Sequence, residues 1–176
     1  MVADWIYKEV ERVIRAHGTR DPFELLDCMD AVTVMSDKYK RKGLKGYCFE
    51  DLRTRFAVIN RKLNRYEQRV VAGHEAAHLI IHKDEIQRSP AKMLKDFNIF
   101  DNSGRIEYQA NLFAADFMLE DGDVYELICD EYHDYFSIAR ELYIPPAFLS
   151  FKLYSMMRRG YDVRPPIDLD SKFLGK

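Results

Sequence analysis

The sequence lacks the paired cysteines that would build a disulfide framework or a zinc site made of thiolates. Its three cysteines, Cys28, Cys48 and Cys129, are odd in number and far apart, and no CxxC pair occurs. Small disulfide-rich domains and cysteine zinc sites both need closely spaced cysteines, usually in larger number. We therefore expect the fold to depend on a hydrophobic core.

Long apolar runs are also missing. No uninterrupted stretch approaches the roughly 20 apolar residues that a bilayer-spanning helix requires. The first 18 residues alternate charged with apolar side chains, and they lack the apolar centre of a secretory signal peptide. These absences predict a cytoplasmic protein without a membrane segment.

The chain has no large excess of charge of one sign. Its 27 Lys and Arg residues oppose 29 Asp and Glu residues, for a formal net charge of −2. A general polyanion binder would carry a basic surplus, so direct nucleic acid binding is not expected. The basic run from Lys38 to Lys45 is expected to be a solvated hairpin turn, with a partner-docking patch as the alternative.

The length of 176 residues and the 47% apolar content suit a single domain with one core. We expect one domain over residues 1–176. Within it, residues 20–122 would form a sheet and the helices of a metal site. Residues 123–160 would form a C-terminal helical pair, and residues 161–176 an irregular tail.

Helical spacing of apolar residues predicts a first helix around residues 5–14 that Gly18 ends, and Asp21-Pro22 predicts the start of a second. The segments 32–36, 44–49 and 55–60 are short, β-branched and aromatic, which predicts a small antiparallel three-stranded sheet. Helices followed by strands and then by more helices indicate an α+β fold.

The second half of the chain is predicted to be helical. Asn64 and Glu67 have the spacing of a capping box before a buried helix over residues 70–81. Residues 101–104 offer caps for a helix that Gly122 ends, and two or three further helices break at Pro145-Pro146.

The stretch VVAGHEAAHLIIH, residues 70–82, contains an HExxH motif formed by His74, Glu75 and His78. On a helix, residues four apart differ by about 40° in azimuth and about 6 Å in height, so the two imidazoles can bind one ion. Glu75, about 100° round the helix, could reach a water molecule instead of the metal. The alternative is a hydrogen-bonded histidine pair in the core.

A third ligand has to come from elsewhere in the chain. The extended motif HExxHxxGxxH would need glycine and histidine where the sequence has Ile81 and Asp84. Glu107 is the better candidate, because it shares a helix face with small alanines and with Asn111, which could orient a ligand. His82 lies about 12 Å along the helix from His74, so a helix-end or orienting role is favoured over ligation.

The motif helix and the segment Glu107-Tyr-Gln-Ala-Asn-Leu-Phe-Ala-Ala together resemble the ImmA/IrrE family of metallopeptidases. The resemblance covers roughly residues 20–160 and departs at Ala76-Ala77 and at FMLEDG. It implies a zincin-like domain of the gluzincin type. It also implies one Zn²⁺ held by His74, His78 and Glu107, with Glu75 as general base.

Family members are commonly encoded on mobile elements, and several cleave helix-turn-helix repressors. The resemblance therefore implies a zinc-dependent, site-specific endopeptidase whose substrate is such a repressor or a related regulator. Tyr132, His133 and Tyr143 are candidates for an oxyanion stabiliser, which the sequence leaves unassigned.

Two other functions remain open. One is a zinc-containing interaction module that docks a regulator without cutting it. The other is a DNA-binding regulator acting through the C-terminal helical pair, although that pair offers mainly Ser150, Lys152 and terminal arginines as polar groups.

Overall fold

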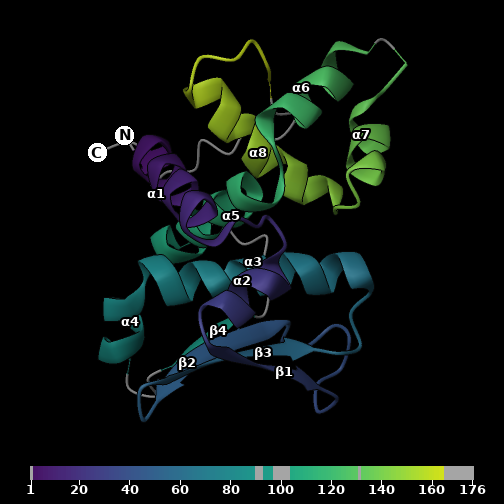
Figure 1. Ribbon diagram of the computed structural model, residues 1–176. Coiled ribbons are helices and arrows are strands. Elements are labelled where there is room, and N and C mark those ends of the chain that lie inside the picture. The colour runs from purple at the N-terminus through teal and green to yellow at the C-terminus, as the bar shows by residue number, and fades with distance from the viewer. Residues whose placement is uncertain (1, 90–92, 97–103, 131, 165–176) are drawn as a thin grey trace.

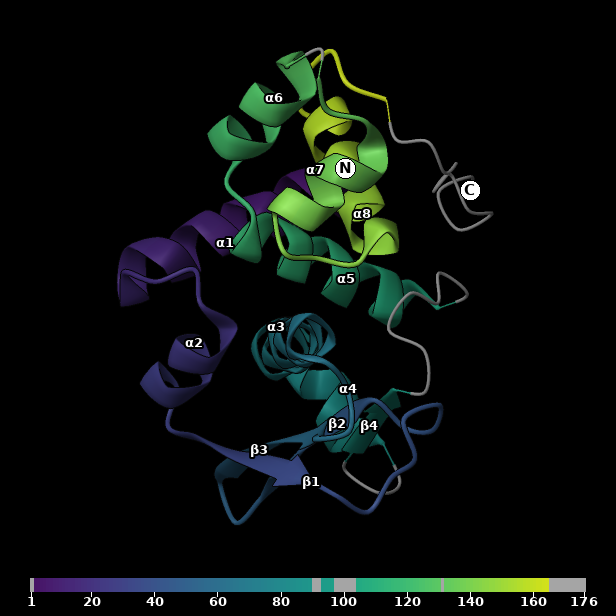
Figure 2. The same cartoon turned by 90° about the vertical axis from the view of Figure 1, so that its right-hand side faces the viewer.

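The computed structural model describes residues 2–89, 93–96, 104–130 and 132–164. A sheet forms one side of the molecule, the helix α3 (Arg65–Ile81) lies across it, and the remaining long helices pack on the other side of α3 (Figure 1). Viewed along α3, these layers follow one another as sheet, α3 and α5 (Arg105–Met118) (Figure 2). The α+β prediction is thereby confirmed.

The first two helices end and begin where the sequence predicts. Helix α1 (Val2–His17) is followed by Gly18 in the left-handed region, at φ 69°, and the Gly18 amide donates to the carbonyl of Ile14. Helix α2 (Pro22–Cys28) starts after Asp21, whose carboxylate accepts hydrogen bonds from two backbone amides of the first turn. Both signals act locally, so they do not depend on the rest of the fold.

The predicted antiparallel three-stranded sheet is wrong in two respects. The sheet has four strands in the order β1-β3-β2-β4, formed by β1 (Ala31–Ser36), β2 (Gly46–Asp51), β3 (Thr54–Asn60) and β4 (Met93–Asp96). Strand β2 is antiparallel to both β3 and β4, but β1 runs parallel to β3.

The parallel pairing changes the role of the basic run between β1 and β2. Because β3 lies between these two strands, residues 37–45 form a crossover connection, and the predicted hairpin turn is wrong. The side-chain amide of Asn60 donates to the carbonyls of Lys40 and Leu44 at 2.9 Å each, which fixes this connection against the end of β3.

Helix α3 is the central element of the core. Asn64 and Glu67 form the predicted capping box, and every residue from Val70 to Leu79 is buried. One side of α3 faces β2 and β3, and the other packs on α5. The fit with α5 is close, because a Cβ added at Gly73 would lie 2.9 Å from the sulfur of Met118 and 3.4 Å from the Cβ of Ala114.

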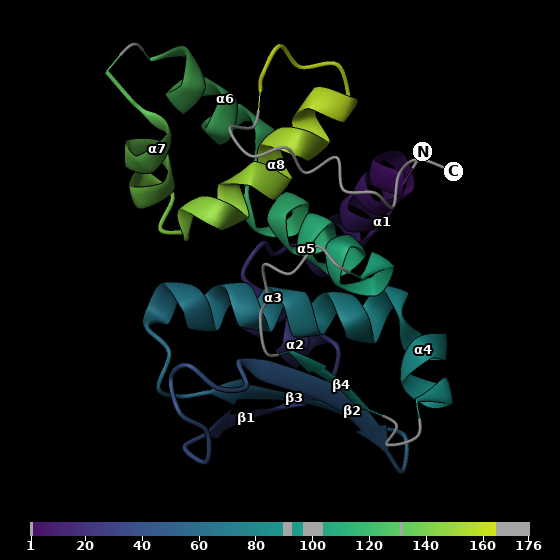
Figure 3. The same cartoon turned by 180° about the vertical axis from the view of Figure 1, so that it is seen from behind.

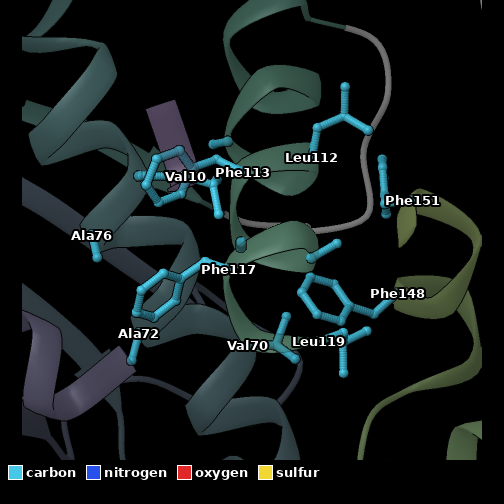
Figure 4. Packing of buried hydrophobic residues seen from close by; sticks show 14 of the residues in the cluster. Val10, Val70, Ala72, Ala76, Leu112, Phe113, Phe117, Leu119, Phe148 and Phe151 are labelled. Atoms are coloured by element: carbon cyan, nitrogen blue, oxygen red, sulfur yellow. The ribbon is translucent and has the colours of Figure 1, made fainter. Parts of the chain in front are cut away.

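Phenylalanines fill the space on both sides of α5. Phe113 and Phe117 lie against α3 beside Ala72 and Ala76, while Phe148 and Phe151 approach from the last helix (Figure 4). All four rings are fully buried or nearly so.

The end predicted for α5 is wrong. The helix stops at Met118 because Leu119 adopts an extended conformation, and Gly122 lies inside the next helix, α6 (Asp121–Cys129). The predicted caps at residues 101–103 lie outside the described residues. A further short helix, α4 (Lys83–Arg88), follows α3 directly.

The predicted break at Pro145-Pro146 is confirmed, since it separates α7 (Tyr135–Glu141) from α8 (Pro146–Arg158). Helix α8 buries every residue from Phe148 to Met156, including Ser150 and Lys152. Ser150, Lys152 and Ser155 therefore face the core, and this burial argues against a recognition helix. Among the described residues, no helix is long and apolar enough to cross a bilayer.

Candidate metal centre

Two neighbouring helices bring the sequence-predicted ligands together. His74 and His78 project from α3, and Glu107 projects from the first turn of α5, which crosses α3 (Figure 3). One atom from each of the three side chains lies within 4.8 Å of the others. Both histidines are fully buried, whereas the Glu107 side chain is 27% exposed.

The spacing of these atoms suits a small tetrahedral cation. The Nε2 atoms of His74 and His78 are 2.9 Å apart, and they lie 3.0 and 3.6 Å from Oε2 of Glu107. Zinc–ligand distances of about 2.0–2.1 Å place tetrahedral ligand atoms about 3.4 Å from one another. The three observed distances lie on both sides of that value.

Hydrogen bonds on the far side of each ring fix which nitrogen faces the centre. Nδ1 of His74 lies 2.9 Å from the amide oxygen of Asn111, so this nitrogen carries the proton and donates it. Nδ1 of His78 lies 2.9 Å from Nδ1 of His82, whose Nε2 is 3.0 Å from the side-chain oxygen of Gln109. An oxygen accepts only, so His82 donates from Nε2 and accepts from His78 at Nδ1.

This chain of hydrogen bonds requires His82 to be neutral. Burial and the neighbouring His78 lower the pKa of His82 to about 4, which keeps one proton on its ring near neutral pH. The Nε2 atoms of His74 and His78 therefore both face the Glu107 carboxylate, because each ring uses its Nδ1 atom for a hydrogen bond on the other side. Three electron-pair donors at this spacing fit a cation, so the residues present match a zinc site.

Glu75 is placed on the sheet side of the same helix. It is fully buried, and Gly46 at the start of β2 lies directly against it, since a Cβ added at Gly46 would be 2.5 Å from Oε1 of Glu75. The same Cβ would lie 2.5 Å from a methyl group of Val71 and 3.2 Å from the carbonyl oxygen of Val58. The missing side chain at Gly46 thus makes the space that the carboxylate occupies.

Replacing Gly46 by alanine is expected to lower the free energy of unfolding by about 1–3 kcal/mol, because the added methyl group overpacks the contact between β2 and Glu75. Combining this change with Glu75→Ala should recover part of the loss, as measured by denaturant unfolding. Gly122→Ala is the control, since a Cβ there meets nothing within 4 Å. If Gly46→Ala lowers the free energy of unfolding equally in the wild type and in the Glu75→Ala variant, the contact between Gly46 and Glu75 is contradicted.

The three candidate oxyanion stabilisers lie at the surface or bind other groups. Tyr132 is 94% exposed, and the His133 ring pairs with the carboxylate of Asp130 at 3.0 Å. Tyr143 is 64% exposed, and its ring packs against Tyr66 near the start of α3.

Sequence reasoning missed two residues around this centre. Gln109 lies two residues after Glu107 and so falls on a different face of the helix, and Gly46 belongs to a strand whose distance from α3 the sequence does not encode. The spacing of His82 and the presence of Asn111 were the available signals for the orienting groups, and both side chains do contact a candidate ligand.

Comparison with known proteins adds an independent finding. A family model described as the IrrE N-terminal-like domain, Peptidase_M78, matches residues 30–154. The curated protein Metallopeptidase ImmA from Bacillus subtilis (strain 168) is 29% identical over 120 residues, which cover 66% of this chain. The match spans 64% of that relative's length. No solved structure matches the chain significantly.

Proposed function

Because the chain belongs to the Peptidase_M78 family of IrrE N-terminal-like domains, we propose that it is a zinc-dependent endopeptidase. The observation that carries this proposal is the convergence of two imidazole Nε2 atoms and one carboxylate oxygen at 2.9–3.6 Å. His74, His78 and Glu107 would hold one zinc ion. Asn111 and His82 would orient the two imidazoles.

Zinc bound there would supply a Lewis acid that activates water and polarises a peptide carbonyl. Glu75 would act as the general base, taking a proton from the attacking water and passing it to the leaving amine. Because Glu75 is buried against Gly46, its carboxylate can adopt few positions. A general base held in a defined position supports efficient proton transfer. Asn111 keeps the His74 proton on Nδ1, so that Nε2 stays available for the metal.

For the substrate, we propose a helix-turn-helix repressor or a related transcriptional regulator, as the family resemblance implies. The burial of the polar side chains of α8 supports a protein partner over DNA bound by that helix.

The test uses the zinc-loaded protein and the helix-turn-helix regulator encoded beside its gene. We expect cleavage of the regulator at one site, its loss when a chelator removes the metal, and its return when zinc is added back. Gel electrophoresis and mass spectrometry of the products measure this result. A regulator that binds the zinc-loaded protein but stays intact would instead establish a docking module without proteolysis.

A further inference from the structure

A groove that the metal centre does not use lies at the start of α3. Two adjacent cavities of about 360 and 620 Å³ meet there, and both are lined by Tyr66 of α3 and by Tyr143 of the turn between α7 and α8. The rings of these two tyrosines have centroids 5.4 Å apart, and Phe136 of α7 lines the smaller cavity. We refer to this surface as the aromatic groove.

The aromatic groove exposes an unusual amount of ring surface. Tyr66 is 42% exposed, Tyr143 64% and Phe136 69%. Aromatic side chains lose few rotamers on binding and bury large areas, so they are typical anchors for protein partners. These rings can still bury much of their surface against a ligand.

Tyr143 occupies a backbone position that favours glycine. Its φ is 55°, in the left-handed region, and it follows Leu142, the residue that caps the end of α7. The turn is held by backbone hydrogen bonds from Tyr143 to Arg140 and from Ile144 to Ala139, which need no side chain at this position. Glycine would adopt the same turn with less strain, so the backbone conformation does not require a tyrosine at this position.

The charges around the groove are mainly positive. Arg65 and Arg69 line the larger cavity and Arg140 the smaller one. Arg69 lies 3.5 Å from Asp21, whereas no ion pair among the described residues involves Arg65 or Arg140. The acidic lining residue, Glu67, already accepts the Asn64 amide of the capping box at 3.0 Å. The exposed guanidinium groups can therefore bind carboxylates.

We propose that the aromatic groove is an exosite for an acidic peptide segment that also carries an apolar or aromatic side chain. The identity of this ligand as part of the substrate rests on the proposed peptidase function. Tyr66 precedes His74 by eight residues, about 12 Å along α3, which is about the length of four extended residues. An extended segment of one substrate chain is thus long enough to reach from the groove to the metal centre.

The test measures binding alone, so that it does not depend on cleavage. The full-length Glu75→Gln protein is titrated separately into two fluorescein-labelled hexapeptides. The acidic peptide is Asp-Glu-Leu-Phe-Glu-Asp and the basic peptide is Lys-Arg-Leu-Phe-Arg-Lys. Fluorescence anisotropy gives the affinity for each. We expect the acidic peptide to bind more tightly than the basic one. Tyr143→Gly and Arg140→Glu should each weaken its binding by about tenfold or more.

Two controls separate binding from folding. Tyr132→Gly removes a tyrosine that is even more exposed than Tyr143 but lies outside the groove, and it should leave the affinity unchanged. Tyr143→Gly should have a Tm equal to or above that of the parent protein, because it relieves the strained backbone. A clear fall in Tm would show that the ring serves the fold, and it would overturn the proposal.

Three results would show that the groove does not bind an acidic peptide or that it has another occupant. Equal binding of the basic peptide, or an affinity that Tyr143→Gly and Arg140→Glu leave unchanged, would overturn the acidic exosite. Dimerisation in sedimentation experiments that Phe136→Ala abolishes would assign the surface to a second copy of the chain and would also overturn it. Peptide binding without regulator cleavage would refute only the peptidase function, and cleavage without peptide binding only the exosite.

Discussion

Glu75→Gln is expected to lower the rate of peptide cleavage by about 10²–10⁴-fold while zinc remains bound, because an amide cannot accept and return the proton that a general base transfers. The substitution keeps the size of the side chain, so the contact with Gly46 is preserved. Initial rates with the regulator as substrate, together with the zinc content of the purified variant, measure both effects.

Glu126→Gln provides the matched control for this experiment. Glu126 lies on the exposed side of α6, away from the ligands on α3 and α5, so its neutralisation should leave the rate unchanged. A Glu75→Gln protein that cleaves the regulator as fast as the wild type would refute the assigned base. Loss of zinc from that variant would instead give Glu75 a role in holding the metal.

Lys152→Met is expected to lower the free energy of unfolding by about 3–5 kcal/mol near neutral pH, the usual cost of removing one partner from a buried ion pair. Nζ of Lys152 lies 3.2 Å from a carboxylate oxygen of Asp116 and 2.6 Å from one of Asp121. Asp116 and Lys152 are both nearly inaccessible to solvent, so water cannot replace the lost contact. Denaturant unfolding followed by circular dichroism gives the size of the effect.

The loss should depend on pH in a defined direction. Burial raises the pKa of Asp116, while Lys152, Ser155 and Arg159 act against that rise. Without Lys152 the pKa of Asp116 rises further, so the folded state favours the protonated acid. The variant then loses stability as the pH rises from the pKa of Asp116 in the unfolded chain to its higher pKa in the folded protein. The variant should therefore be less impaired at about pH 4, near the ordinary pKa of aspartate, than at pH 7.

The surface pair of Arg12 and Glu9 supplies the comparison, since the Arg12 side chain is 61% exposed and its ion pair is screened by water. Arg12→Met should change stability far less than Lys152→Met. Equal effects at the two positions, or a Lys152→Met loss that does not vary with pH, would contradict the structural role given to the buried cluster.

The helices could be predicted from the sequence because their start and stop signals act within one turn. Asp21 caps α2, the capping box of Asn64 and Glu67 opens α3, and Gly18 ends α1, each through backbone groups of adjacent residues. Gly122 misled the prediction because glycine is also tolerated inside a helix, at a modest cost. There the extended Leu119 ends α5 three residues earlier.

The sheet could be predicted only in part because strand order is a property of distant segments. The turn residues around β2 and β3 indicate their hairpin, but nothing in residues 31–36 states that β1 pairs in parallel with β3. Strand β4, with the sequence MLKD, has no β-branched or aromatic residue and follows a polar stretch. Its pairing with β2 supplies the strand character that its composition lacks.

The metal centre could likewise be predicted only in part. The spacing of His74 and His78 is encoded within a single helix, so the sequence alone predicts their convergence. Glu107 required both the alanine-lined face of α5 and the family resemblance, because its position depends on how α5 crosses α3. Gly46 could not be predicted, since its contact with Glu75 joins a strand to a helix about 30 residues away in the sequence.

X-ray absorption at the zinc edge, combined with the metal content of the purified protein, tests the central claim most directly. The proposed function predicts one zinc per chain, with two imidazole nitrogens and oxygen ligands at about 2.0–2.2 Å, and His78→Ala should lose the stoichiometric zinc. Sulfur ligands at about 2.3 Å, or wild-type zinc content in the His78→Ala variant, would contradict a site built from His74, His78 and Glu107.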